Sequence, residues 1–225
     1  KGSILAQTYN LSGRTLSKGT HVSEEILELL NRENVKNILC AVPHEGDIHE
    51  DSAAEAISKA LDKNQLYAEE ASTGRVNFRT PALSIVRYNR ELIKKINLVD
   101  ESIAFSIVEH NQLLAKNDLI ATLKIIPFFV SKIYVEQVVS LIAKNEIFKV
   151  HRLQEKKVEL IQTYYDWQKK SIFKATSNVT SSRLDALGCS LQKERLIPHD
   201  HKSLCSEINS SIDSGAQVLL ISGAS

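Results

Sequence analysis

The loop at 162–171, QTYYDWQKKS, carries the residue types in this sequence that are best suited to chemistry. Thr163 offers a hydroxyl group, and Lys169, Lys170 and Lys174 offer positive charge at the expected start of a helix. Ammonium groups, a hydroxyl group and the positive end of a helix dipole together suit a bound phosphate group. The alternative interpretation is an ordinary solvated loop whose lysines extend into water.

A second loop, made only of small residues, follows the last apolar run. Ser222, Gly223, Ala224 and Ser225 come directly after the run at 218–221. A ligand can approach the backbone N–H groups of such a loop because no large side chain intervenes. We expect Gly223 either to permit this approach or to adopt a positive φ angle. Neither loop has the GxGxxG pattern, which argues against a standard dinucleotide-binding fold.

Alternating apolar runs and helical patterns predict how these loops are positioned. Strands are predicted at 158–163, 190–197 and 217–222, with a helix in each interval. Asp200 is expected to cap the second helix. Helical crossovers imply parallel strands, whose carboxyl ends bring both loops to one edge if the first and third strands are neighbours. The region is therefore predicted to be part of a doubly wound, mainly parallel, three-layer α/β domain.

The same patterns predict which side chains fill the core of this domain. We expect Leu184, Ile208, Val218 and Leu220 to lie in one core. Gly188 and Gly215 follow the two helices, at positions where a left-handed residue commonly ends a helix.

The first 150 residues predict a different, α+β organisation without a repeating unit. Helices are predicted at 24–33, 52–61, 90–97 and 134–144, the second of them capped by Asp51. Short apolar runs predict strands at 3–8, 37–42, 82–88, 102–108 and 119–130. The charge-rich segment HRLQEKK separates the two regions, which gives domains at 1–152 and 153–225.

Composition narrows the classes of function. The chain has 225 residues, of which 43% are hydrophobic, enough for a sizeable core. Its 28 basic and 27 acidic residues nearly balance, so net charge gives no reason to expect nucleic acid or a membrane as a partner. Three distant cysteines without a CxxC pair favour free thiols in the cytoplasm. Methionine is absent, even at position 1. We therefore expect either an internal segment of a longer protein or a sequence from which modified methionines have been left out.

Three further groups of residues have both a functional and a structural interpretation. His199, Asp200 and His201 resemble metal ligands, but adjacent polar residues at a helix start more often form a cap, so we predict no metal site. The segment HEGDIHED at 44–51 lacks the spacing of a calcium loop, and a turn leading into a helix explains it. Arg75 either reaches a phosphate or molybdate group or forms a structural salt bridge. No catalytic set can be assembled from the sequence.

The order of these features resembles the molybdopterin-binding domain of molybdenum cofactor biosynthesis proteins, a group related to the molybdopterin molybdotransferases. The likeness is carried by Thr163, by the RL and LG pairs at 183–184 and 187–188, by the PHD turn at 198–200 and by the final SGAS. Upstream, the segments GRTLSKGT, HEGDIHEDSAAEAI, TGRVN and KIIPFFV resemble a longer bacterial form of these proteins. This sequence has Gly-Ala-Ser where family members usually have Gly-Gly-Thr-Gly.

The resemblance implies a cytoplasmic protein that binds molybdopterin or a related pterin phosphate. Its ligand would contact the residues that follow the first and third strands: Thr163, Lys169, Lys170, Lys174, Ser222, Gly223, Ala224 and Ser225. If the protein is an enzyme, the resemblance implies molybdenum insertion or adenylylation, with Mg²⁺ and ATP, in a protein able to form homo-oligomers. The alternative is a non-catalytic carrier or sensor of the cofactor. We also expect the α/β domain to be incomplete at Ser225.

Overall fold

A computed structural model describes residues 2–61 and 66–223. The chain divides into two compact units, Lys1–His151 and Arg152–Ser225, each of which is described by itself. The boundary expected between residues 152 and 153 lies one residue from this division. Both units mix helices with strands, which agrees with the expected α+β region followed by an α/β region.

The amino-terminal part of the first unit is a small cluster of short strands with one helix. Its elements are β1 (Ile4–Leu5), β2 (Tyr9–Leu11), β3 (Arg14–Leu16), α1 (Glu24–Arg32) and β4 (Cys40–Ala41). The Ser23 hydroxyl accepts a hydrogen bond from Ile26 N, which explains why α1 begins after it. Leu16, Ile26 and Leu30 form a small apolar core in which Leu5 is also buried.

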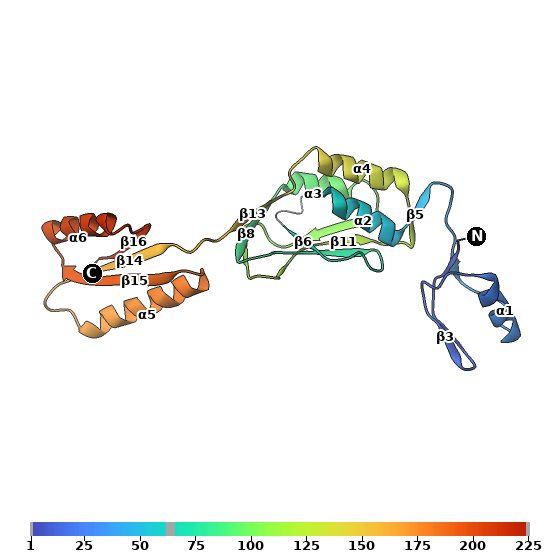
Figure 1. The fold of residues 1–225 in the computed structure, drawn as a ribbon, viewed down its shortest axis with the longest axis horizontal. Coiled ribbons are helices and arrows are strands. Elements are labelled where there is room, and N and C mark those ends of the chain that lie inside the picture. Colours follow the sequence, from blue (N-terminus) through green and yellow to red (C-terminus); the bar gives the residue numbers. More distant parts are fainter. Residues whose placement is uncertain (1, 62–65, 224–225) are drawn as a thin grey trace. The chain divides into compact units, whose positions relative to one another are not determined.

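The rest of the first unit packs helices against short sheets (Figure 1). The elements are β5 (Asp47–His49), α2 (Glu50–Ala60), β6 (Tyr67–Ala68), β7 (Arg75–Arg79), β8 (Ser84–Tyr88), α3 (Arg90–Asn97), β9 (Ile103–Ile107), β10 (Gln112–Leu114), β11 (Leu119–Ile125), β12 (Phe129–Ser131), α4 (Lys132–Ala143) and β13 (Phe148–Arg152). The largest sheet has the order β6-β7-β11-β9, with antiparallel neighbours. Its buried residues, with those of α2, α3 and α4, form one large apolar core.

Two expectations for this unit are wrong in detail. The run at 119–130 forms two strands, β11 and β12, and not one. Helix α2 begins at Glu50, and the His49 ring accepts from Asp51 N as its cap. Asp51 does not cap the helix, because its Oδ1 accepts a hydrogen bond from Gly74 N at 2.6 Å. A tertiary contact therefore takes the carboxylate that the local pattern assigned to the cap.

The second unit is a three-stranded parallel sheet with two helices. The elements are β14 (Lys157–Tyr164), α5 (Lys170–Ala186), β15 (Ser190–Pro198), α6 (His201–Asp213) and β16 (Val218–Ser222). The strand order is β15-β14-β16, and both pairings with β14 are parallel. The predicted strands and their parallel pairing are thus confirmed.

Both helices of this unit end as the sequence indicates. Gly188 and Gly215 follow α5 and α6 with φ angles of 70° and 82°, a conformation that glycine adopts without steric cost. Asp200 caps α6, because its Oδ1 accepts from Ser203 N at 2.9 Å. The pKa of Asp200 lies below its usual range, mainly because its carboxylate accepts a hydrogen bond from the Ser203 hydroxyl and also because it accepts one from the Ser203 N–H.

The two helices contact opposite faces of the sheet, as hydrogen bonds and Figure 1 show. Gln162 of β14 donates to Ser177 of α5 at 3.1 Å. Glu159, an odd number of residues away on the same strand, accepts from Ser211 of α6 at 2.8 Å. Because successive side chains of a strand point to opposite faces, α5 and α6 lie on different sides of β14.

Burial in this unit is concentrated on the central strand. Val158 through Thr163 are all buried, whereas β15 and β16 are partly open. A single helix, about 10 Å wide, covers each face, which is enough for the middle strand but not for its neighbours. The expected shared core is therefore only partly present: Leu184 is 8% exposed, Ile208 and Leu220 are half-buried, and Val218 is 38% exposed.

Candidate functional site

The carboxyl edge of the β15-β14-β16 sheet brings three loops together. Thr163, near the end of β14, is buried, and its Oγ1 donates to the carbonyl oxygen of Ser222 in β16 at 3.4 Å. Thr163 Oγ1 also lies 2.8 Å from Nδ1 of His199, which follows β15. A hydroxyl has one proton, so His199 Nδ1 is the donor when Thr163 donates to Ser222. The sequence predicted that the loops after the first and third strands meet at this edge. The structure adds His199, from the loop after the second strand.

The positions of the expected ligand contacts differ in exposure. Thr163 is 3% exposed, and Ser222 is half-buried beside it. Lys169, Lys170 and Lys174 are all exposed at the start of α5. Ala224 and Ser225 lie outside the described residues.

Gly223 is exposed, and its structure separates the two explanations offered for it. The residue is not among the glycines with a positive φ angle, so backbone conformation does not require glycine here. A Cβ atom at Gly223 would meet nothing within 4 Å among the described residues. The left-handed explanation is therefore wrong, and the described residues leave the approach to this backbone open.

The amino end of α5 has an uncompensated positive character. Lys169 occupies the N-cap position and makes no side-chain capping bond, and the first turn contains no acidic residue. Helices usually begin with a side-chain acceptor and favour negative charge in the first turn. Here Lys169, Lys170 and Lys174 add positive charge instead, which favours an anion at this end.

A polar network fixes α5 on its face of the sheet. Gln162 is 1% exposed, and its Nε2 lies 3.0 Å from Phe173 O, 3.1 Å from Ser177 Oγ and 2.5 Å from Glu194 Oε1, so its two N–H groups are shared among three acceptors. Ser177 also hydrogen-bonds to Glu194. These bonds hold the helix that carries the three lysines. Sequence reasoning missed the network, although a glutamine inside an apolar strand was a visible signal.

A second network ties α6 to the opposite face. Glu159 accepts from the hydroxyls of Ser211 and Ser214, each at 2.8 Å, and pairs with Arg195 at 3.5 Å. Burial raises the pKa of Glu159, but the two serine hydrogen bonds and the charges of Arg195 and Lys193 outweigh it, so the pKa lies below its usual range. Arg195 also pairs with Glu207 at 2.5 Å. The network is structural, because its groups satisfy one another.

The segment at 44–51 has a structural explanation, whereas Arg75 lacks, among the described residues, the salt bridge that was its structural interpretation. Asp47 Oδ2 accepts from His44 N at 2.9 Å, so part of the segment at 44–51 forms a turn before α2. Among residues 2–61 and 66–223, no group of three or more His, Cys, Asp and Glu is arranged to hold a metal ion. Arg75 is exposed at the start of β7 and forms no salt bridge with the described residues. The cysteines Cys40, Cys189 and Cys205 are free thiols.

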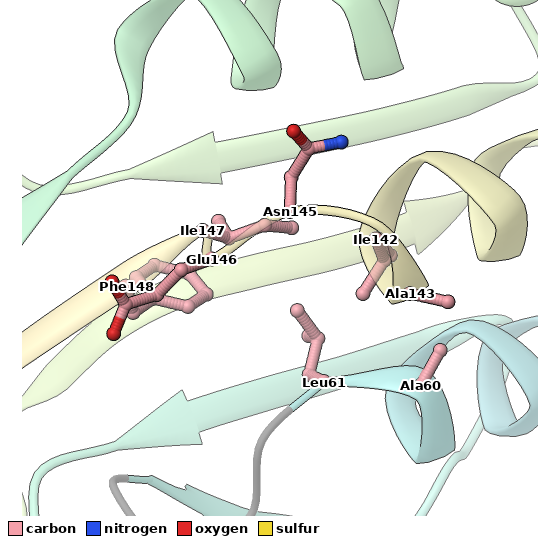
Figure 2. A pocket seen from close by; sticks show the side chains of 8 residues that line it. All are labelled: Ala60, Leu61, Ile142, Ala143, Asn145, Glu146, Ile147 and Phe148. Carbon is pink, nitrogen blue, oxygen red and sulfur yellow. The ribbon is translucent and has the colours of Figure 1, made fainter.

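The first unit also has a pocket, between the ends of α2 and α4 (Figure 2). Figure 2 shows Leu61 and Ile142 pointing toward each other across it, while the amide of Asn145 points away. A small-molecule site normally adds convergent polar groups to an apolar lining. Leu61 is also the last described residue before 62–65, so we assign no ligand to this pocket.

No family, curated protein or solved structure matches this chain. The interpretation of the carboxyl edge therefore depends on its own geometry. In the described part of the chain, no helix is both long and apolar enough to cross a membrane.

Proposed function

We propose that the second unit binds molybdopterin or a related pterin phosphate at the carboxyl edge of its sheet. The observation that carries the proposal is the parallel adjacency of β14 and β16, joined there by the contact between Thr163 and Ser222. In open α/β sheets, ligands bind beyond the carboxyl ends of strands where the strand order reverses. The order β15-β14-β16 reverses between β14 and β16.

The chemistry of this edge suits a phosphate group. The exposed backbone at Gly223 supports close approach, and the uncapped start of α5 supports negative charge. Lys169, Lys170 and Lys174 would supply charge, and the Ser222 hydroxyl would hydrogen-bond to the phosphate. Thr163 would act at the base of the site, where it holds His199. Ala224 and Ser225 complete the proposed loop.

The proposal includes the wider setting that the resemblance implies. A complete domain of this kind is doubly wound and three-layered, and the protein would act in molybdenum cofactor biosynthesis in the cytoplasm. As a transferase it would insert molybdenum or adenylylate molybdopterin, with Mg²⁺ and ATP, in a monomer or homo-oligomer. Any residues that hold Mg²⁺ would therefore have to come from outside the described groups of His, Cys, Asp and Glu. The alternative is a carrier or sensor that binds without turnover.

Gly223→Val tests the proposed site. The branched side chain would enter the open space above the backbone, so we expect binding of molybdopterin to be lost. Folding should be nearly unchanged, because a Cβ atom there meets no neighbour and Gly223 is not in the left-handed region. Anaerobic calorimetric titration, beside a thermal melt, measures both effects, and Ala115→Val, at an exposed position of the first unit without a positive φ angle, is the control.

Two results would contradict the proposal. Wild-type protein that does not bind molybdopterin or its adenylylated form removes the function itself. Normal binding by Gly223→Val would move the site elsewhere. A protein that binds both ligands but shows no turnover with ATP and Mg²⁺ would favour the carrier over the transferase.

A further inference from the structure

Three aromatic rings form a continuous wall at the carboxyl edge of the second unit. Tyr165 and Trp167 are stacked, with ring centroids 5.8 Å apart and an angle of 12° between their planes. The Tyr165 ring also contacts the ring of His199 at 4.7 Å. Trp167 is 72% exposed, although tryptophan is on average a highly buried residue in folded proteins. The structure thus presents a large π-surface to solvent.

Hydrogen bonds fix this aromatic wall to the end of β14. Tyr165 N donates to Gln168 Oε1 at 2.8 Å, and Gln168 N donates back to Tyr165 O at 3.0 Å, which closes the turn that carries Trp167. The ring of His199 hydrogen-bonds to the Thr163 hydroxyl, and the backbone N–H of His199 donates to Tyr164 O at 2.9 Å. Rings held in this way lose little conformational freedom when a ligand stacks on them.

The wall stands beside both a hollow and a source of positive charge. Thr163, His199, Asp200, His201 and Leu204 line a cavity of about 270 Å³. Lys169 and Lys170 follow Trp167 in the chain and are exposed. A ligand that combines a flat ring with an anionic group can therefore meet an aromatic face and ammonium groups within one short segment.

We propose that Trp167, supported by Tyr165 and His199, is the stacking platform for a planar heteroaromatic ring that carries a phosphate group, namely the pterin of the ligand. The assignment rests on the proposed function and deepens it by giving the ring and the phosphate separate contacts. Aromatic rings prefer offset stacking over flat π-systems, and cation-rich surroundings suit the phosphate. The platform would thus select ligands by ring shape, and the lysines by charge.

The chain contains one tryptophan, so its fluorescence reports on Trp167 alone. Titration of the full chain with neopterin monophosphate should quench this emission to saturation. N-acetyltryptophanamide at the same absorbance corrects for light absorbed by the pterin. Parallel titrations with AMP and with inorganic phosphate test whether a purine ring, or the phosphate group alone, also changes the emission.

Substitution then tests the contact. Trp167→Ala should weaken binding of neopterin monophosphate about tenfold, because the aromatic surface on which the ring stacks is removed. Trp167→Phe should restore part of the affinity. Tyr67→Ala, which removes another exposed aromatic ring (60% exposed) from the first unit, should change nothing. Calorimetry gives the affinity of the variants that lack tryptophan, and a thermal melt shows that they fold.

The outcomes separate this proposal from the function on which it rests. Calorimetric binding of molybdopterin that Trp167→Ala leaves unchanged overturns the platform and keeps the function. Failure of wild-type protein to bind either pterin overturns both. Saturable quenching by AMP alone overturns the pterin assignment. If the emission changes with protein concentration but does not respond to the pterin phosphate, Trp167 is covered by another protein molecule. That result also overturns the proposal.

Discussion

Single side chains at the carboxyl edge of the second unit have more than one task. Thr163 lies on a buried strand, yet its hydroxyl joins His199 to the backbone of Ser222. Gln162, its neighbour, shares its two N–H groups among three acceptors on the other face of the same strand. Polar residues at such positions stay buried only because each is hydrogen-bonded. They determine where the loops above them lie.

Thr163→Val tests the joining role of this hydroxyl. The substitution preserves shape but removes the bonds to His199 and Ser222, so we expect a loss of about 1 kcal/mol in stability. Amide hydrogen exchange should become faster at Ile197 and His199. Thr176→Val is the matched control, because its hydroxyl bonds only within α5, to Ile172 O. Equal effects of the two substitutions would show that the joining role is wrong.

At the scale of elements, α5 is held by few apolar contacts. Leu184 is its one fully buried residue, whereas Ile172, Val179 and Leu187 are 50%, 49% and 41% exposed. These three apolar residues are not buried, because the inner face of α5 meets the polar side chains of Gln162 and Glu194. Helix α6 shows the same pattern, with Ser211 buried and Ile212 63% exposed. Helical spacing identified the helices but not the residues they bury.

Leu184→Ala should therefore destabilise the second unit by about 2–5 kcal/mol, as truncation of a buried leucine generally does. Val179→Ala on the same helix should cost less than about 0.5 kcal/mol, because the side chain is half in solvent. Chemical denaturation followed by the fluorescence of Trp167 measures both changes in the unit that contains them. Similar losses in the two variants would mean that the buried face of α5 is misassigned.

At the scale of the molecule, the two units are stabilised differently. The first unit has one large apolar core built from three helices and several strands. The second adds to its buried central strand two polar networks, centred on Gln162 and Glu159. Apolar burial does not depend on pH, but a network with an ionised carboxylate does. The Glu159 network should therefore make the stability of the second unit sensitive to pH.

The pKa of Glu159 gives the direction of this effect. A carboxyl whose pKa is lowered by folding contributes stability above its unfolded pKa, and this stability is lost as the pH falls through the folded pKa. Below about pH 4, near the usual range of a glutamate, hydrogen-exchange protection of α6 should decrease. Glu159→Gln should show a smaller decrease, because no charge is lost. The amides of α3 serve as the control, and equal pH dependence in both proteins would contradict the assignment.

For the second unit, the sequence by itself determined the order of elements, the parallel pairing of the strands and the ends of the helices. Those features follow from local patterns: apolar periodicity, Asp200 as a cap, and glycines in the left-handed conformation. Tertiary structure decided the rest. Asp51 accepts a hydrogen bond from Gly74 N instead of capping α2, and His199 hydrogen-bonds to Thr163 of the neighbouring strand. Trp167 stacks on Tyr165. Each depends on groups brought together by packing, which residue spacing along the chain does not encode.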